Sequence, residues 1–444
     1  MASEREREEE PSPESVYYSI TAADASRAAD AGVLYQWNKR IWEAQDHTRL
    51  EAEAFLWLTL HYPHKATPKV AQSCVAAAIM GAEKLPQPAR HDLIVPLQNG
   101  YLQIDMATGD LQLIEPRPED GITYVLEAYF IPTARASLFM KFLADVLGKD
   151  EPTISWVQEY VGYTLMGDCR YQKALFLVGK GANGKSTFAE IIAALHRRVV
   201  SLQLNALTGF RLTPLLDASL VLVDETPQRI DEQSFKSLVS GGLCQVDRKF
   251  RDPISFRPRA KWLILGNAMP AISDQSHGFW RRMGVVPFMK QFTQAEQDST
   301  LGTKIIEQEL SGVLNWAIEG LIRLTRRGRF LEETRSMEAA QMEGQLESNS
   351  VMAWWNDDRA EVNGNFETPR SAIYRDYQSW CSDNGMSPLG AERFWNRLKA
   401  LAGTEAVVPR ARKLDGQTVR VVPLRLTRSQ QNSVGKVVTA GWGR

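Results

Sequence analysis

The sequence predicts an α/β fold in which a parallel sheet carries a phosphate-binding loop, and three observations support this prediction. The stretch Ala174–Ile191 reads as an apolar strand, a glycine-rich loop and a helix. The apolar run Leu220–Val223 ends in the acid pair Asp224-Glu225, and the run Lys261–Leu265 ends in Gly266-Asn267. Because the carboxyl ends of parallel strands meet at one edge of a sheet, we expect these polar strand ends to form a ligand site.

The loop follows the pattern G-x-x-x-x-G-K-S, which is typical of proteins that bind nucleoside triphosphates. Glycines let successive backbone N–H groups face a phosphate, and the next helix adds the partial positive charge of its N-terminus. Lys185 is expected to reach the β- and γ-phosphates and Ser186 to ligate Mg²⁺, so the expected cofactors are ATP and Mg²⁺. A purely structural glycine turn would not need this Lys-Ser pair. The expected ATP-binding residues are Gly179, Lys180, Gly181, Ala182, Asn183, Gly184, Lys185, Ser186 and Thr187.

The later motifs supply the other catalytic candidates. Asp224 is expected to hold the hydrated Mg²⁺, and Glu225 to orient or deprotonate the attacking water. An acid pair on the surface at a strand end is the alternative, which the preceding loop disfavours. The Asn267 amide would sense the γ-phosphate or position water. Arg281 and Arg282 are expected to reach the nucleotide of a neighbouring subunit, as an arginine finger.

Composition argues against a membrane protein or a disulfide framework. The 444 residues are 44% hydrophobic and 24% charged, which is ordinary for a globular protein. An apolar run of about 18 residues and a signal peptide are both lacking, so we expect a soluble protein in the cytoplasm of a bacterium or a virus-infected host cell. The four cysteines are far apart and form no C-x-x-C pair, which disfavours a zinc site.

Charge is unevenly distributed along the chain. The formal net charge is −1, but Glu4–Glu14 contains six Glu and two Arg, whereas Glu405–Arg444 contains eight Lys or Arg and two acids. Residues 1–14, with two prolines and no apolar face, are expected to be a disordered acidic tail. The basic C-terminal stretch leaves nucleic acid open as a partner.

The segments before the phosphate loop are expected to be helical and then β-structured. Residues 15–90 are assigned to a helical region, with apolar residues at helical spacing in Val33–Trp42, Leu50–Leu60 and Val70–Ala82. In residues 91–150, Leu93–Pro116 alternates around turn residues and predicts hairpins.

Three further elements are expected before the loop. These are a strand at Ile122–Ile131 and helices at Ser137–Leu147 and Pro152–Met166. Asp105 and Asp110 are interpreted as turn-forming residues rather than as a primase centre.

Residues 151–330 are assigned to an ATPase domain. Between its second and third strands, Asp231–Gly241 predicts a short helix and Val246–Phe256 a hairpin. Basic residues stand near the tip of that hairpin, namely Arg248, Lys249 and Arg251.

The C-terminal region has the outline of a winged helix. Residues 331–366 are expected to be a helical linker, 367–428 the winged-helix domain and 429–444 a basic tail. Within the domain, a helix capped by Thr368 and a second helix precede a basic hairpin around Asp415-Gly416. The expected DNA contacts are Arg393, Arg397, Arg412 and Lys413. A protein-interaction domain with a solvated basic wing remains open beside this interpretation.

The order of phosphate loop, acidic strand end, basic hairpin, strand-Asn and Trp-Arg-Arg resembles that of superfamily 3 helicases. It is most similar to the helicase part of phage and plasmid primase–helicases, which are kin to the poxvirus primase–helicase. The resemblance covers about Leu93 to Leu324. The matching stretches are Tyr160–Lys185, Leu220–Glu225, Phe235–Phe256 and Lys261–Phe288.

This resemblance implies an AAA+-like P-loop ATPase that forms a hexameric ring and moves along single-stranded DNA. It makes Asn267 the sensor, Arg281 or Arg282 the finger, and Lys249 with Arg248 the DNA-tracking hairpin tip. The primase catalytic domain that often precedes such helicases is expected to be absent, so a separate primase or polymerase is a candidate partner.

The expected function is therefore that of an ATP-dependent DNA helicase in the replication of a phage, a plasmid or an integrated mobile element. The alternative is a replication initiator that binds origin DNA and uses ATP for assembly without unwinding. Strand displacement on a forked duplex separates the two.

Overall fold

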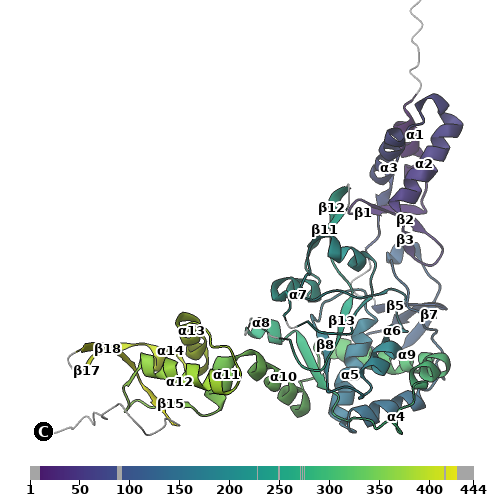
Figure 1. The fold of residues 1–444 in the computed structure, drawn as a ribbon. Coiled ribbons are helices and arrows are strands. Elements are labelled where there is room, and N and C mark those ends of the chain that lie inside the picture. The colour runs from purple at the N-terminus through teal and green to yellow at the C-terminus, as the bar shows by residue number, and fades with distance from the viewer. Residues whose placement is uncertain are drawn as a thin grey trace, which may run out of the picture. The chain divides into compact units, whose positions relative to one another are not determined.

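The computed structural model describes residues 11–87, 93–227, 229–248, 251–270, 272, 274, 276–414 and 417–427, with the backbone alone at 248, 251, 252 and 414. The chain divides into two compact units, the first running to Ala340 and the second beginning at Gln341 (Figure 1). Among the described residues, we find no helix long and apolar enough to cross a membrane. The expected basic tail, 429–444, lies outside the described residues.

The first unit begins with three helices and a small sheet of order β3-β2-β1-β4. The Ser12 hydroxyl caps α1 by accepting the Ser15 N–H at 3.2 Å. The expected acidic tail over 1–14 is therefore wrong at its end, because α1 already begins at Pro13; residues 1–10 lie outside the described residues. The elements are α1 Pro13–Ala22, β1 Arg27–Asp30, β2 Val33–Trp37, β3 Trp42–Ala44, α2 His47–His61, α3 Pro68–Gly81 and β4 Glu83–Lys84.

The predicted helix over Val33–Trp42 is wrong, because this stretch forms β2 and the start of β3. A two-residue turn precedes it, in which Ala31 and Gly32 have φ of 47° and 77°. Two successive positive φ values are what a tight hairpin requires, and they pair Asp30 with Val33. The predicted helices around Leu50–Leu60 and Val70–Ala82 are confirmed as α2 and α3.

The second sheet is the predicted antiparallel hairpin system, β5 Leu93–Leu97, β6 Gly100–Ile104 and β7 Leu111–Ile114. The strand predicted at Ile122–Ile131 does not form. Its backbone groups bond to separate partners instead: the Leu126 N–H donates to Pro96 O at 2.9 Å, and the Glu127 N–H to Leu195 O at 2.9 Å. A segment that links several elements in this way has its groups satisfied without a ladder.

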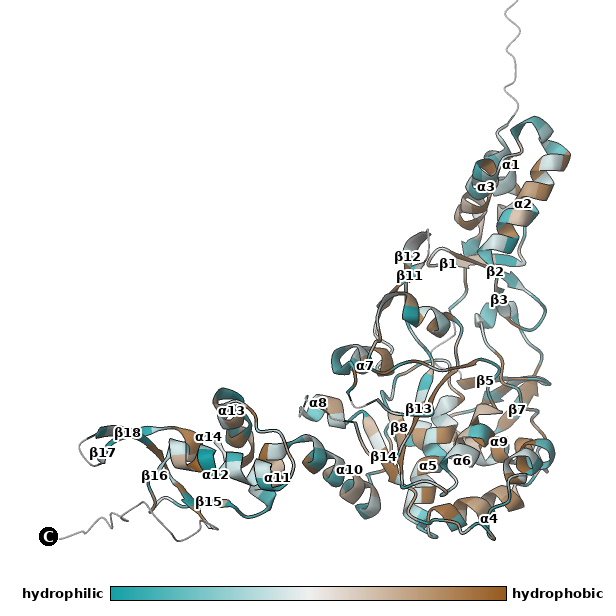
Figure 2. Cartoon of the chain, viewed as in Figure 1, coloured by the Kyte–Doolittle hydropathy of each residue, from teal (hydrophilic) through white to brown (hydrophobic). Residues whose placement is uncertain are grey.

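The central sheet contains five strands, all parallel, in the order β14-β8-β13-β10-β9. Every residue of β13 is buried, as is expected for a parallel sheet covered on both faces. Figure 2 shows apolar residues along β8 and β13. The strands are β8 Ala174–Val178, β9 Val199–Val200, β10 Leu220–Val223, β13 Lys261–Gly266 and β14 Met283–Pro287.

Helices and one hairpin complete the first unit, and a single hydrophobic core joins the β5–β7 sheet to the central sheet. The predicted helices before the loop, and the predicted short helix and hairpin after it, are all present. The elements are α4 Ser137–Val146, α5 Glu151–Thr164, α6 Lys185–Ala193, α7 Glu232–Val239, β11 Cys244–Arg248, β12 Arg251–Phe256, α8 His277–Trp280, α9 Leu301–Arg327 and α10 Arg335–Ser348, which runs across the boundary between the units.

A buried carboxylate joins α5 to α9. The Glu159 side chain is fully buried, and its Oε1 accepts from Arg323 Nε at 3.2 Å and from Arg327 Nη2 at 2.5 Å. Its other oxygen accepts the Leu331 N–H at 3.1 Å. The carboxylate thus fixes the end of α9 and the chain that follows it.

Replacement of Glu159 by alanine is expected to lower the free energy of unfolding by about 2 kcal/mol, because it removes a buried carboxylate that two partly exposed arginines contact and orphans a backbone N–H. Urea denaturation followed by circular dichroism measures the effect. The control is Arg49→Ala, which removes an ion pair whose side chains are 74% and 47% exposed and should change little. An equal effect of the two substitutions would contradict the structural role of Glu159.

The second unit packs helices on two small antiparallel sheets, of order β16-β18-β17 and β15-β19. Its core includes Trp354, Tyr377 and Phe394. The elements are α11 Ser350–Asn356, β15 Ala360–Val362, β16 Thr368–Pro369, α12 Arg370–Asp383, α13 Ala391–Ala402, α14 Thr404–Val407, β17 Arg410–Leu414, β18 Gln417–Val422 and β19 Leu424–Leu426.

Two details of the C-terminal prediction are corrected. The expected linker, 331–366, contributes to the core of the second unit through Val351, Trp354 and Ala360, so that the unit starts well before 367. Thr368 does not cap α12, because it lies in β16 and its hydroxyl donates to the Leu424 carbonyl. The predicted hairpin turn Asp415-Gly416 lies outside the described residues.

Candidate nucleotide-binding site

The glycine-rich loop lies between the end of β8 and the start of α6. Gly181, Ala182 and Gly184 have φ of 79°, 47° and 85°, and this left-handed backbone turns the chain sharply into the helix. Gly184 precedes α6, and no side chain caps the first N–H groups of that helix. Uncapped N–H groups at a helix N-terminus suit a bound anion, so the loop fits the phosphate chain of a nucleotide.

The Lys185 ammonium lies inside this loop. Its Nζ donates to Gly179 O at 2.6 Å and to Asn183 Oδ1 at 2.9 Å, and the side chain is only 6% exposed. Burial lowers the pKa of Lys185 below its ordinary value. Lysine has three N–H donors, so one remains for a ligand. Ser186, the next residue, is exposed at the start of α6.

The strand order brings the three predicted polar strand ends to one edge of the sheet. β13 lies between β8 and β10, and the register pairs Gly266 with Val178 and Ile264 with Val223. Asn267 therefore follows the strand next to the phosphate loop, and the acid pair follows the strand after that. All three of Asn267, Asp224 and Glu225 are exposed at this edge.

These residues fit the Mg²⁺–ATP complex that the motif implies. Mg²⁺ is usually held in nucleotide sites by one or two protein oxygens together with phosphates and waters. Ser186 and Asp224 would supply such oxygens, since both are exposed on the same edge. The described residues contain no group of three or more His, Cys, Asp or Glu side chains that could hold a metal by themselves.

The arginine pair lies at the opposite edge of the sheet. Arg282 immediately precedes β14, and its carbonyl accepts the N–H of Ala174, the first residue of β8, at 2.8 Å. The phosphate loop follows the other end of β8, a strand length of about 15 Å away at about 3.3 Å per residue. Neither Arg281 nor Arg282 is therefore positioned to serve the phosphate loop of its own chain.

The two arginines differ in their freedom to move. Arg282 is half-buried; its Nε donates to Ser240 Oγ at 2.8 Å, and its Nη1 donates to the Gly278 carbonyl. Burial, and to a smaller extent Arg281, lower the pKa of Arg282. Arg281 is exposed, and its Nη2 donates to Gln172 Oε1 at 3.0 Å. Sequence reasoning missed this glutamine, because an isolated Gln two residues before a strand carries no motif.

The expected DNA contacts lie on the β11–β12 hairpin and in the second unit. Lys249 lies outside the described residues, as do the side chains of Arg248 and Arg251, although β11 and β12 form the predicted hairpin. In the second unit, Arg393 and Lys413 are exposed. The other two are engaged: Arg397 Nη1 donates to Asn349 Oδ1 at 3.2 Å, and Arg412 pairs with Glu367 at 2.7 Å.

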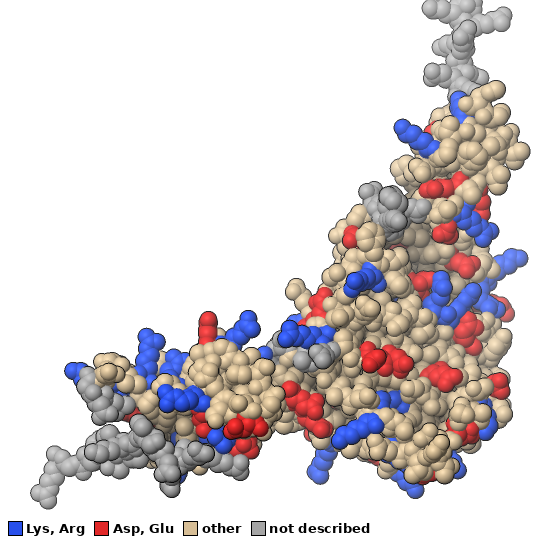
Figure 3. Space-filling model, in the orientation of Figure 1, with Lys and Arg blue, Asp and Glu red and all other residues tan. Residues whose placement is uncertain are grey.

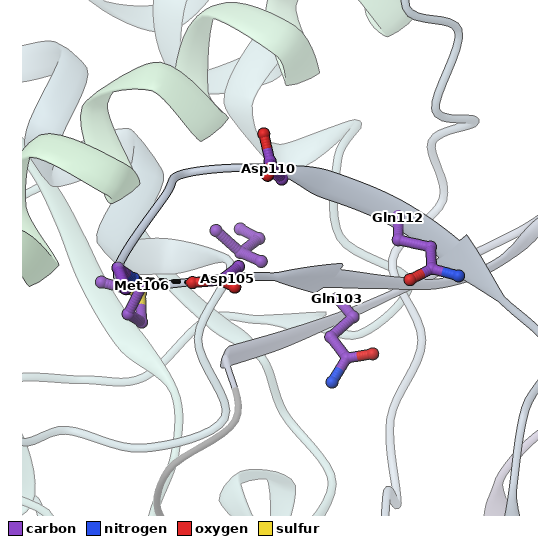
Figure 4. A pocket seen from close by; sticks show the side chains of 7 residues that line it. Gln103, Asp105, Met106, Asp110 and Gln112 are labelled. Carbon is purple, nitrogen blue, oxygen red and sulfur yellow. Dashed lines mark hydrogen bonds between the residues drawn. The ribbon is translucent and has the colours of Figure 1, made fainter.

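A hollow of about 520 Å³ lies over the β6–β7 hairpin and shares no residue with the phosphate loop (Figure 4). Asp105 accepts the N–H groups of Thr108 and Ala107 there, and these bonds lower the pKa of Asp105. This is the turn-forming role predicted from the sequence. The lining residues are Gln103, Ile104, Asp105, Met106, Ala107, Asp110 and Gln112.

Comparisons with known proteins match both units. A family model described as "Family of unknown function (DUF5906)" matches residues 177–282, which include the phosphate loop and the arginine pair. A model described as "Poxvirus D5 protein-like" matches residues 346–418 in the second unit. The "Putative helicase L207/L206" of Acanthamoeba polyphaga mimivirus is 28% identical over 193 residues, which is 39% of this chain and 20% of that protein.

Solved structures also align with the chain. An apo structure of the C-terminal region of NrS-1 has a TM-score of 0.49 at 10% identity, covering 94% of this chain and 100% of that one. A second apo structure of this region has a TM-score of 0.47 at 11% identity, covering 88% and 93%.

The poxvirus D5-like model matches the second unit. The match to the mimivirus protein, which is named as a helicase, is a separate finding, because it is a match to a single protein and not to a family model. The phosphate loop, the acid pair and the strand-end asparagine lie at one edge of a five-strand parallel sheet. The chain is thus kin to the D5-like helicases of superfamily 3.

Proposed function

We propose that the protein is an ATP-driven helicase that moves along single-stranded DNA during replication of a phage, plasmid or other mobile element. The observation that carries this proposal is the placement of the catalytic groups at two edges of one sheet. Lys185, Asp224, Glu225 and Asn267 belong to the edge with the phosphate loop, whereas Arg281 belongs to the other edge. In a ring, the phosphate-loop edge of each subunit can face the Arg281 edge of the next, which brings both sets of residues together. We propose that this ring is a hexamer.

The proposed reaction is hydrolysis of the γ-phosphate of ATP. Lys185 and the N–H groups at the start of α6 bind the phosphates, and Ser186 and Asp224 would hold Mg²⁺, which offsets phosphate charge when bound. Glu225 takes a proton from a water molecule while the water oxygen attacks the γ-phosphorus. The bond between the γ-phosphorus and the β–γ bridging oxygen breaks, and ADP leaves. Asn267 orients that water.

The charge that develops on the transferred phosphoryl group needs a further cation. Arg281 of the next subunit would supply it, because its exposed guanidinium can leave Gln172 at the loss of one hydrogen bond. Arg282 is instead held by Ser240 and Gly278 and is better suited to fixing the segment that presents Arg281.

The second unit offers a basic surface for the nucleic acid backbone, in agreement with a winged-helix interpretation. Figure 3 shows Lys and Arg side chains over the β17–β18 end of this unit. Arg370 begins α12 directly after Pro369 of β16, and Arg420 directly precedes Val421 of β18, which pairs with Pro369. The Arg370 guanidinium lies 4.2 Å from the centroid of the Trp395 ring, a face-on contact that orients it.

The Arg370 and Arg420 charges repel one another, and together they raise the positive potential of this surface. Burial lowers the pKa of Arg370, and Arg420 lowers it further. Two neighbouring guanidinium groups of this kind favour a bound phosphate. Arg412, by contrast, has its charge offset by Glu367. We therefore propose that Arg370 and Arg420, with Arg393 and Lys413, carry more of the DNA contact than Arg412 does.

The double replacement Arg370→Ala/Arg420→Ala is expected to weaken DNA binding at low salt and to reduce the slope of log affinity against log salt by about 1 to 2, because about two phosphate contacts are lost. Fluorescence anisotropy with labelled single-stranded and duplex DNA measures both quantities. Arg425→Ala is the matched control, since this arginine pairs with Glu361 on β15. An unchanged salt slope in the double variant would rule out this surface.

The helicase proposal is tested on a forked duplex with a labelled strand. Displacement that requires ATP and stops with a non-hydrolysable analogue is the expected result. An origin-binding initiator would bind the fork without displacing the strand, and that outcome would replace the proposal with the alternative. The Lys185→Ala variant serves as the control for contaminating helicases.

A further inference from the structure

The side chain of Asn183 lies between the phosphate-loop lysine and the end of β14. Its Oδ1 accepts from Lys185 Nζ at 2.9 Å, and its Nδ2 donates to Phe288 O at 3.0 Å. The side chain is 3% exposed, so water does not compete well for either bond. The ammonium group only donates and the carbonyl only accepts, so the amide has one orientation that satisfies both partners.

The backbone around Asn183 is shaped for this contact. A Cβ atom on Gly179 would come within 2.1 Å of Asn183 Nδ2 and 2.4 Å of Phe288 O. Glycine at 179 therefore leaves the space that the amide crosses to reach β14. Phe288 itself is fixed, because its N–H donates to Val178 O at 2.7 Å. Hydrogen bonds thus connect Asn183 to Phe288, and Phe288 in turn to Val178 at the end of β8.

We infer that Asn183 is a positioning residue for Lys185, with its oxygen holding the ammonium inside the loop and its N–H group anchoring that oxygen to the end of β14. This inference rests on the proposed hydrolysis of ATP and names a residue at a variable position of the motif. Lys185 keeps its third donor for the phosphates, while its bonds to Asn183 and Gly179 O remove most of its freedom to swing away.

The consequence of this positioning can be measured as a separation of catalysis from binding. An ammonium held in one place meets the charge that develops on the γ-phosphate in the transition state. An ammonium that can swing away from Gly179 O and Asn183 Oδ1 keeps much of its attraction to bound ATP but loses this alignment, so the loss should fall on kcat more than on KM.

Two replacements of Asn183 should change different kinetic constants. Asn183→Ala frees the ammonium to swing away, so kcat should fall up to about 100-fold with a smaller change in KM. Asn183→Asp puts a carboxylate beside the ammonium that competes with the phosphates for it, so KM should rise as well. Both variants lose the anchor to Phe288 O.

The experiment measures kcat and KM for ATP separately at one neutral pH. Gly179→Ala is a second route to the same defect, since its methyl group would displace the amide, and it should lower kcat as Asn183→Ala does. Asn99→Asp is the matched control: this exposed amide also donates to a carbonyl, Phe130 O at 2.9 Å, but lies in the β5–β6 turn.

Each outcome is informative. A fall in kcat for Asn183→Ala and an added rise in KM for Asn183→Asp, with thermal unfolding by circular dichroism near that of the wild type, support the positioning role. Unchanged constants, or the same change in kcat and KM in both variants, would overturn it, and the asparagine would then serve only loop folding. A wild-type protein without ATPase activity would instead refute the proposed function itself.

Discussion

Replacement of Lys185 by alanine is expected to reduce ATP hydrolysis at least about 100-fold, because a preorganised charge that would face the phosphates is lost. Lys185 is 6% exposed, and its ammonium is held inside the loop by Gly179 O and Asn183 Oδ1. Phosphate release in the presence and absence of single-stranded DNA measures the effect.

The matched control for Lys185→Ala is Lys141→Ala, which removes an exposed lysine from α4 in the same unit. Its hydrolysis rate should equal that of the wild type. Binding of a fluorescent ATP analogue, measured in parallel, separates loss of affinity from loss of the chemical step. A Lys185→Ala protein that hydrolyses ATP at the wild-type rate would mean that the nucleotide site lies elsewhere.

Replacement of Arg281 by alanine is expected to reduce hydrolysis about 1000-fold or more, the usual contribution of an arginine finger. The sheet geometry adds a sharper expectation, because Arg281 lies at the edge opposite to its own phosphate loop. A neighbouring subunit with an intact Arg281 should therefore restore hydrolysis at the phosphate loop of an Arg281→Ala subunit. Glu225→Gln, which keeps the shape of the side chain and loses the base, should be inactive because its own phosphate-loop edge lacks the group that activates water.

Mixed assemblies test this directly. In a mixture of Arg281→Ala and Glu225→Gln subunits, some interfaces combine the intact Glu225 of one subunit with the intact Arg281 of the next, and hydrolysis should reappear. A mixture of Lys185→Ala with Glu225→Gln should stay inactive, since both defects lie on the same edge of the sheet. Failure of the first mixture to recover, with assembly shown by light scattering, would contradict a site shared between subunits.

Arg282→Ala should behave differently from Arg281→Ala. Its guanidinium bonds Ser240 and Gly278 and is half-buried, so its loss should lower thermal stability as well as activity. Comparison of the two variants by circular dichroism assigns the finger to one member of the pair, a choice that the sequence left open.

Local chemistry explains which elements could be predicted. The phosphate loop requires glycine, lysine and serine at fixed spacing, so its position between β8 and α6 followed from the residues alone. The apolar runs of β10 and β13 are short, buried and followed by polar residues, a pattern that few other structures share. The same reasoning failed for Val33–Trp42, where apolar residues at helical spacing concealed a hairpin set by the positive φ of Ala31 and Gly32.

Contacts between distant segments explain what could not be predicted. The stretch Ile122–Ile131 has strand-like composition, yet its backbone bonds to Pro96 of β5 and to Leu195 after α6, two separate segments, and forms no continuous ladder with either. The second unit begins before the expected boundary because Trp354 packs on Tyr377 and Phe394, residues that follow it by more than twenty positions in the chain. No pattern within a short window contains such information.

The sequence by itself determined which residues are candidates for the proposed reaction: the loop expected to bind phosphates, the acids that would hold Mg²⁺ and activate water, and the asparagine at a strand end. Only the tertiary structure decided how they are arranged. The order β14-β8-β13-β10-β9 sets Asn267 between the loop and the acids. The parallel pairing of β14 with β8 sends Arg281 to the far edge. Strand order and direction depend on how whole segments pack, so the proposal that a subunit needs its neighbour follows from the fold and not from the motifs.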